Sequence, residues 1–195
     1  GAKLVFPGPK MGDPAVLTQL MNEEGVTLAA GVPTIWTLLL HYLRQSGTKL
    51  NTLQRTIVGG AAVPLSMIRD FHHEFGVTVV QGWGMTEMSP LGTVSTLRPE
   101  MESLPLEEQF RLRQLAGHGI FGVSMKVVDD EGRELPWDGK SAGELKVRGP
   151  WVCSGYFRLE HSSAHDKDGW FATGDVSVIH PNGFMQITDR AKDVI

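Results

Sequence analysis

The chain has 195 residues, 41% of them hydrophobic and 21% charged, which is the composition of an ordinary globular protein with one sizeable core or two small ones. Its formal charge of −4 comes from interspersed acids and bases, and no apolar run approaches the roughly 20 residues that span a bilayer, so we expect no nucleic-acid partner and no transmembrane segment. The single cysteine, Cys153, excludes an internal disulfide framework and fits a reducing compartment, so we expect a cytoplasmic protein.

Residues 1–95 alternate between short apolar runs and helix-like stretches. The apolar runs predict strands at residues 3–6, 26–30, 56–58 and 77–80. Asp13 offers a helix N-cap followed by Pro14 at the first helical position, and Gly25 ends that helix. A second helix begins at Pro33 and a third near Pro64, both with apolar residues at helical spacing. This β-α-β-α rhythm predicts an α/β fold, in which helices cover part of a parallel sheet.

The pattern changes near residue 95. Residues 96–118 are polar and predict a linker with a short helix. Residues 119–188 hold short apolar or alternating runs separated by the turn signals DDEG, PWDGK and HPNG. These runs predict a small antiparallel β subdomain, an open barrel, with strands at residues 124–128, 144–148, 176–180 and 184–188.

The stretch QGWGMTE follows the expected strand at residues 77–80, at the sheet edge where open α/β proteins bind ligands. Gly82 and Gly84 allow close approach of a ligand to the backbone. Trp83 offers a flat face for a base, and Thr86 has a hydroxyl that can donate to a phosphate oxygen. Glu87 is suited to Mg²⁺, which takes one or two carboxylates plus phosphate oxygens. The stretch fits a nucleoside triphosphate with its metal; the alternative is a turn with a packed Trp and a solvated Glu.

Three further segments carry groups of the same kind. GGAAVP, residues 59–64, is a second glycine-rich exit from a strand, and its backbone groups can line an adenine edge. TGD, residues 173–175, places a carboxylate suited to ribose hydroxyls. DRAKD, residues 189–193, can bring Arg190 and Lys192 to a ribose or a phosphate. Each segment, taken alone, is also open to interpretation as a plain turn, and for DRAKD alone we favour a solvated charged turn.

Taken in order, five blocks resemble the adenylate-forming acyl-CoA synthetases, the superfamily that also holds luciferases and peptide-synthetase adenylation domains. The blocks are GGAAVP, QGWGMTE, GELKVRGPWVCSGYF, DGWFATGD and DRAKDVI. GVPTIW and the insert SLPLEEQFRLR look most like the fatty acyl-CoA ligase branch. The resemblance implies that ATP and Mg²⁺ activate a medium- or long-chain fatty acid as an acyl-adenylate, and that coenzyme A then takes the acyl group.

The resemblance also implies roles for residues near the nucleotide. The adenine would be lined by Gly60, Ala61 and Ala62, with Trp83 stacked on it where the family often has Tyr. Gln81 and Met85 would complete the nucleotide-binding stretch, in which Gly82, Gly84 and Met85 also form the floor of the acyl channel.

The catalytic roles follow from the same resemblance. Thr86 would contact the phosphate and Glu87 would hold Mg²⁺. Asp175 would bind the ribose hydroxyls, with Arg190 nearby, and Lys192 would lie at the hinge about which a C-terminal domain rotates.

The fatty-acid channel is implied to run along residues 32–36 and the helix that follows. Trp36 could gate that channel. The alternative, which we favour, is an aromatic residue of the hydrophobic core on one face of the helix.

Both ends of the chain look cut. It opens GAKLVFPGPKMG, without a Met or a signal-peptide pattern, and stops at DRAKDVI, so we expect an internal piece of a longer protein. The family's upstream phosphate loop and its C-terminal domain with the adenylation lysine are not among the 195 residues, and residues 189–195 would be the hinge to that domain. We therefore predict little or no ligase activity for these residues alone.

Three alternatives stay open at this point. The first is an aryl-CoA ligase or another adenylate-forming enzyme. The second is a nucleotide-binding module without catalysis, and the third is a structural α/β domain whose motif matches are turns. The sequence also leaves open whether the whole protein is a homo-oligomer.

Overall fold

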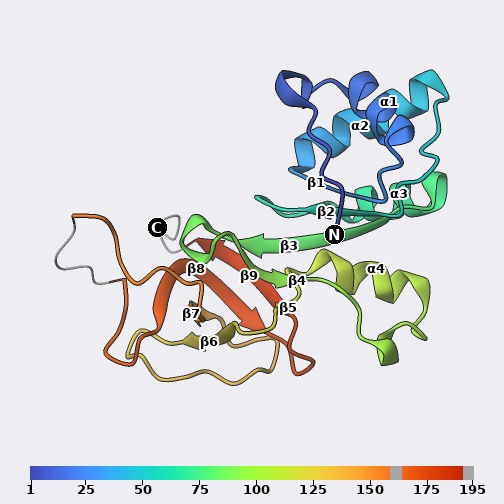
Figure 1. The fold of residues 1–195 in the computed structure, drawn as a ribbon. Helices are drawn as coiled ribbons and strands as arrows, with labels where there is room; N and C mark the ends of the chain where they lie inside the picture. Colours follow the sequence, from blue (N-terminus) through green and yellow to red (C-terminus); the bar gives the residue numbers. More distant parts are fainter. Residues whose placement is uncertain (159–163, 191–195) are drawn as a thin grey trace. The chain divides into compact units, whose positions relative to one another are not determined.

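The structure, a computed structural model, describes residues 1–158 and 164–190 (Figure 1). Its contacts divide the chain into two compact units, Gly1–Gln81 with Pro105–Gln114, and Gly82–Leu104 with Leu115–Ile195. The first boundary between the units falls inside a strand, β3 (Thr78–Gly84).

The first unit is a parallel α/β arrangement, as predicted. β1 (Leu28–Gly31), β2 (Arg55–Val58) and the first half of β3 pair in parallel in that order. The connections between these strands are helical, which is the usual way to join parallel neighbours. The helices of this unit are α1 (Pro14–Glu23), α2 (Pro33–Ser46), α3 (Leu65–Phe75) and α4 (Leu106–Gln114), with a 3₁₀ turn, η1, at Gly8–Lys10.

Local chemistry fixes the helix ends. The Asp13 carboxylate accepts hydrogen bonds from the backbone N–H groups of Ala15 and Val16, which confirms it as the N-cap of α1. Gly47 ends α2 and Gly76 ends α3, both in the left-handed conformation with φ of 68° and 66°. Glycine pays no Cβ penalty there, so these caps are readable from the sequence.

The core of the first unit lies between the helices and the sheet. Trp36 on α2 is 1% exposed and meets Phe71 on α3 edge to face, with ring centroids 6.1 Å apart. This confirms the interpretation of Trp36 as a core aromatic residue. The other large, fully buried side chains of this core are Leu39, Leu43, Ile68 and Phe110.

The second unit is built from antiparallel strands. The last residues of β3 pair with β4 (Leu91–Val94), which in turn pairs with β5 (His118–Gly119). A separate four-stranded sheet has the order β6-β7-β8-β9, which confirms the predicted antiparallel β subdomain. Its strands are β6 (Ser124–Val128), β7 (Gly143–Arg148), β8 (Phe171–Ile179) and β9 (Met185–Arg190), and the unit also holds the 3₁₀ turns η2 (Thr86–Met88) and η3 (Pro99–Met101).

Two local predictions are wrong, and one alternative interpretation is excluded. Residues 3–6 form no strand, because among the described residues they have no partner to pair with. Residues 81–84 are strand rather than loop, since they complete β3 and pair on to β4, a strand that the sequence pattern did not indicate. Residues 173–175 lie inside β8 rather than in a turn.

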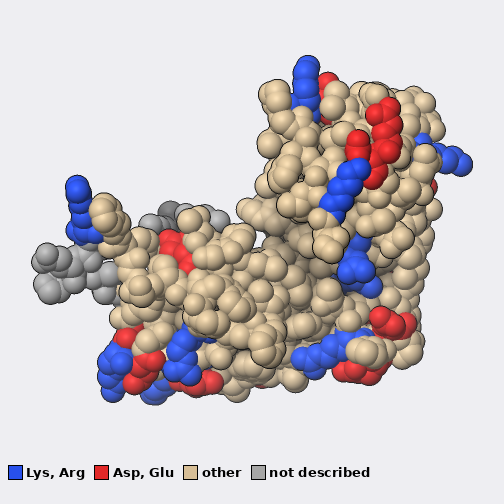
Figure 2. All heavy atoms as spheres, in the orientation of Figure 1, with Lys and Arg blue, Asp and Glu red and all other residues tan. Residues whose placement is uncertain are grey.

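Charges of both signs are interspersed on the face seen in Figure 2, in agreement with the charge pattern of the sequence. Several of them pair across elements, as Arg44 does with Asp70 at 2.8 Å. Among the described residues, no helix combines the length and apolarity needed to cross a bilayer.

The turn between β6 and β7 contains an acid-sensitive contact. The Asp138 carboxylate accepts hydrogen bonds of 2.8 Å from the backbone N–H groups of Ser141 and Lys140 and from the Ser141 hydroxyl. These donors favour the charged form and lower the pKa of Asp138 to about 2. A depressed pKa adds stability at pH values above the unfolded-state pKa of 3.8, and this stability is lost as the pH falls through about 2.

We therefore expect Asp138→Ala to lower the denaturant midpoint at pH 7, and the difference from the wild type to shrink between pH 4 and pH 2. Urea unfolding followed across this range measures both effects. Asp130→Ala, which removes an exposed aspartate from another turn, is the control and should show little change. An Asp138→Ala difference that is equal at pH 7 and pH 2 would contradict the linkage.

Candidate functional site

An irregular stretch of β8 carries the first site residue. Glu144 of β7 is paired with Val176 and Lys146 with Ala172, so residues 173–175 all stand opposite Leu145 alone. Gly174 has a φ of 76°, which bends the strand there. Bulges of this kind are found beside active sites, where they redirect a side chain. Here the bulge sets the direction of the Asp175 side chain.

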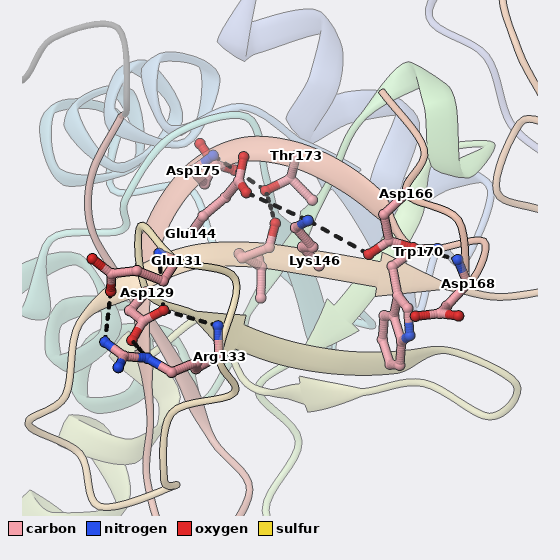
Figure 3. Close-up of polar contacts among 11 residues, drawn as sticks. Asp129, Glu131, Arg133, Glu144, Lys146, Asp166, Asp168, Trp170, Thr173 and Asp175 are labelled. Carbon is pink, nitrogen blue, oxygen red and sulfur yellow. Dashed lines mark hydrogen bonds and ion pairs between the residues drawn. The ribbon is translucent and has the colours of Figure 1, made fainter. Parts of the chain in front are cut away.

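Thr173 stabilises the bulge. Its hydroxyl donates to the Leu145 carbonyl at 2.9 Å and accepts a hydrogen bond from the Asp175 backbone N–H at 3.1 Å (Figure 3). The backbone on both sides of Gly174 is therefore held, although glycine itself is permissive. Arg190 of β9 is the cross-strand partner of Asp175, so the strand register brings these two predicted site residues together.

Trp83 links the stretch QGWGMTE to Asp175. Its indole Nε1 donates to Asp175 Oδ2 at 2.9 Å, although the two residues are 92 positions apart in the sequence. Trp83 is only 8% exposed, and a Cβ added at Gly92 would lie 2.7 Å from its ring. The indole is therefore packed, as the alternative interpretation held, and it also orients the carboxylate. Stacking of Trp83 on a base stays a prediction.

The segment from Gly84 to Leu91 forms a tight loop around η2. A Cβ added at Gly84 would overlap the carbonyl oxygen of Pro90 and lie 2.9 Å from Leu91 Cα, so the two sides of the loop touch at their backbones. The loop presents Thr86 as an exposed residue and Glu87 as a half-buried one. A hydroxyl and a carboxylate thus occupy consecutive positions of a constrained backbone.

The segment after β7 holds this loop. Trp151 Nε1 donates to the Leu91 carbonyl at 3.3 Å, and the Trp151 carbonyl accepts from the Ser89 hydroxyl at 3.3 Å. The backbone N–H of Cys153 donates to the Glu87 carbonyl at 2.7 Å. These three contacts hold the loop at Glu87, Ser89 and Leu91, so residues 149–156, which the sequence matched only as a motif, have a structural function. Cys153 contributes its backbone, and its thiol is not needed for this contact.

Tyr156 is a site residue that the sequence prediction omitted. Its hydroxyl donates to Glu87 Oε1 at 2.8 Å. This hydrogen bond, together with burial, raises the pKa of the Tyr156 hydroxyl. The only sequence signal was its place at the end of the block GELKVRGPWVCSGYF, since nothing local links residue 156 to residue 87.

The carboxylate of Glu87 fits a Mg²⁺ that is held mainly by a substrate. Among the described residues there is no group of three or more His, Cys, Asp or Glu that could form a metal cage. Mg²⁺ does not need such a cage, because it usually binds one or two carboxylates, substrate phosphates and water. Glu87 is accessible, and only its Oε1 atom is occupied by a hydrogen bond within the described chain.

Four of the remaining predicted residues belong to the first unit. Gly60, Ala61 and Ala62 are exposed in the first unit, and Gly60 has a φ of 84°. Gln81 is buried, and its Oε1 accepts from the Val63 backbone N–H at 3.1 Å, so it anchors the GGAAVP segment to β3. Their roles toward a nucleotide stay predictions.

Three more of the site residues predicted from the sequence remain to be placed. Gly82 is buried in β3, and Met85 packs against the core of the second unit. Lys192 lies outside the described residues.

Known proteins are similar to this chain along its whole length. The family model described as AMP-binding enzyme matches residues 1–157. A 3-methylmercaptopropionyl-CoA ligase of Ruegeria lacuscaerulensis is 51% identical over 195 residues, and a medium-chain-fatty-acid–CoA ligase of Ectopseudomonas oleovorans is 48% identical over 195 residues. The chain is covered completely in both cases but spans only 36% and 35% of these relatives.

The fold is also similar to solved structures. A crystal structure of a long-chain-fatty-acid-CoA ligase from Archaeoglobus fulgidus matches with a TM-score of 0.76 at 24% identity. The match covers 91% of this chain and 37% of that one. At this identity the likeness concerns the fold.

Proposed function

Because the chain belongs to the AMP-binding enzyme family, we propose that it is part of an AMP-forming fatty acid–CoA ligase. The whole protein would join a medium- or long-chain fatty acid to ATP, release pyrophosphate, and pass the acyl group from the adenylate to coenzyme A. The proposal concerns the whole protein, since the chain spans about a third of the curated relatives it matches.

The observation that carries the proposal is the hydrogen bond from Trp83 to Asp175. This hydrogen bond joins Trp83 and Asp175, which come from separate motifs and which we assign to the same bound nucleotide. A carboxylate fixed in this way is suited to accept hydrogen bonds from the two hydroxyls of a ribose.

The chemistry of the first step fits the loop that carries Thr86 and Glu87. A carboxylic acid is a poor electrophile, and attack of its carboxylate on the α-phosphate of ATP provides a good leaving group. Negative charge develops on the phosphate oxygens, so the site must supply positioned donors and a cation. We propose that the Thr86 hydroxyl donates to a phosphate oxygen and that Glu87 holds Mg²⁺, which would neutralise the charge.

The fatty acid is the proposed substrate class because the medium-chain ligase is among the relatives of highest identity. The name of the 3-methylmercaptopropionyl-CoA ligase favours a short thioether acid as the second candidate. An aryl acid and a non-catalytic nucleotide-binding module are the remaining alternatives. Comparison of fatty, thioether and aromatic acids in one assay separates the substrate candidates.

The test is acid-dependent exchange of pyrophosphate into ATP by the full-length protein. We expect Asp175→Asn to raise KM for ATP about 10- to 100-fold, since a hydrogen bond to a charged group contributes roughly 1.5–3 kcal/mol. Asp168→Asn, at an exposed turn position of the same unit, is the matched control and should leave KM unchanged. ATP binding without exchange for any acid would favour the non-catalytic module. An unchanged KM in Asp175→Asn would remove Asp175 from the nucleotide site.

A further inference from the structure

Glu87 is held at both its backbone and its side chain by one short segment. The Cys153 N–H donates to the Glu87 carbonyl at 2.7 Å, and the Tyr156 hydroxyl donates to Glu87 Oε1 at 2.8 Å. The two donors are three residues apart in the stretch that follows β7. A glutamate side chain has several rotamers, and contacts at both ends select one of them.

We propose that Tyr156 is a positioning residue for the metal-binding carboxylate of Glu87. By holding Oε1, its hydroxyl fixes the carboxylate plane and leaves Oε2 as the atom that binds Mg²⁺. This inference rests on the proposed function, because it assigns a support to the metal ligand of that site.

The geometry suits the coordination chemistry of Mg²⁺. The ion requires near-ideal octahedral geometry, and a carboxylate commonly offers it one oxygen. Hydrogen bonds to the ligating groups orient them, and loss of such a partner typically weakens metal affinity 10- to 100-fold. A carboxylate with both oxygens free to rotate could not present one oxygen in a fixed direction.

Tyr156 is 42% exposed, which separates this role from a packing role. Removal of its hydroxyl by Tyr156→Phe keeps the ring and creates no buried unpaired group. The chain contains one other tyrosine, Tyr42, which packs against the core of the first unit. Tyr42→Phe is therefore a matched control that removes the same atom elsewhere.

The experiment measures metal binding directly in the full-length protein. Mn²⁺ replaces Mg²⁺ as the probe, and its binding in the presence of a non-hydrolysable ATP analogue is followed by electron paramagnetic resonance. We expect Tyr156→Phe to weaken Mn²⁺ binding about 10-fold, and Tyr42→Phe to leave it unchanged. In pyrophosphate exchange, Tyr156→Phe should raise the half-saturating Mg²⁺ concentration by a similar factor, with kcat at saturating Mg²⁺ and KM for the fatty acid unchanged.

The outcomes distinguish this inference from the function on which it rests. Suppose that the wild-type protein binds Mn²⁺ with the analogue and exchanges pyrophosphate. If the Tyr156→Phe variant then has the same Mn²⁺ affinity, the positioning role alone is overturned. A lower kcat with an unshifted metal dependence also overturns it, because that result indicates a structural role. A wild-type protein that shows neither Mn²⁺ binding nor exchange overturns the proposed function and the inference together.

Discussion

Glu87→Gln is expected to lower kcat for pyrophosphate exchange by about 100- to 1,000-fold at saturating ATP. The amide keeps the size of the side chain but removes the negative charge that would hold Mg²⁺ at the phosphates. Loss of one group that stabilises transition-state charge typically costs a factor of this size. The amide can still accept a hydrogen bond from Tyr156, so the loop should keep its conformation.

The control for Glu87→Gln is Glu108→Gln, which makes the same chemical change at an exposed position in the first turn of α4. It should exchange pyrophosphate at the wild-type rate. Thermal unfolding of both variants should match that of the wild type, which separates lost chemistry from lost structure. A Glu87→Gln rate within about threefold of the wild type would show that this carboxylate does not support the reaction.

Gly84→Ala is expected to damage both the fold and the activity. The added Cβ would overlap the Pro90 carbonyl oxygen and lie 2.9 Å from Leu91 Cα, and backbone atoms cannot yield as a flexible side chain can. Overpacking of this kind typically destabilises by about 1–3 kcal/mol. Because the loop also carries Thr86 and Glu87, a shift of about 1 Å should lower kcat on the order of 100-fold.

Denaturant unfolding and pyrophosphate exchange measure the two effects of Gly84→Ala. Gly12→Ala is the control, since Gly12 has ordinary backbone angles and no atom within 4 Å of an added Cβ. It should change neither quantity measurably. Normal stability together with normal exchange in Gly84→Ala would mean that the loop opens at little cost, and that the contact with Pro90 does not shape the site.

The helices of the first unit could be predicted because their signals are local. Asp13 caps α1 through N–H groups two and three residues away, and Gly47 ends α2 by its own backbone freedom. The parallel strands followed from the apolar runs between these helices. Local chemistry thus determines much of the α/β arrangement.

The strands around the site could not be predicted in the same way. β4 and the second half of β3 contain glycines, and they form because each pairs with a strand that only the folded chain supplies. The bulge at residues 173–175 likewise depends on the register with β7. A sequence pattern read along one strand does not contain the register of its neighbour.

The same difference between local signals and tertiary contacts applies to the site residues. Trp83 and Asp175 belong to motifs and were both predicted, but their hydrogen bond joins positions 92 residues apart and appears only in the structure. Tyr156 was not predicted, because its partner Glu87 lies 69 positions away. Motifs indicated the candidate site residues, and tertiary contacts determined which of them touch one another.

Gly92 restricts which sequences can carry this site. Any side chain there would begin within 3 Å of the Trp83 ring and of the Met88 methyl group, and a displaced indole would release Asp175. A random-mutagenesis screen for lost function would therefore group Gly92 with the residues that bind substrate. Libraries designed to alter the proposed acid preference should keep position 92 fixed and vary residues whose neighbours can move.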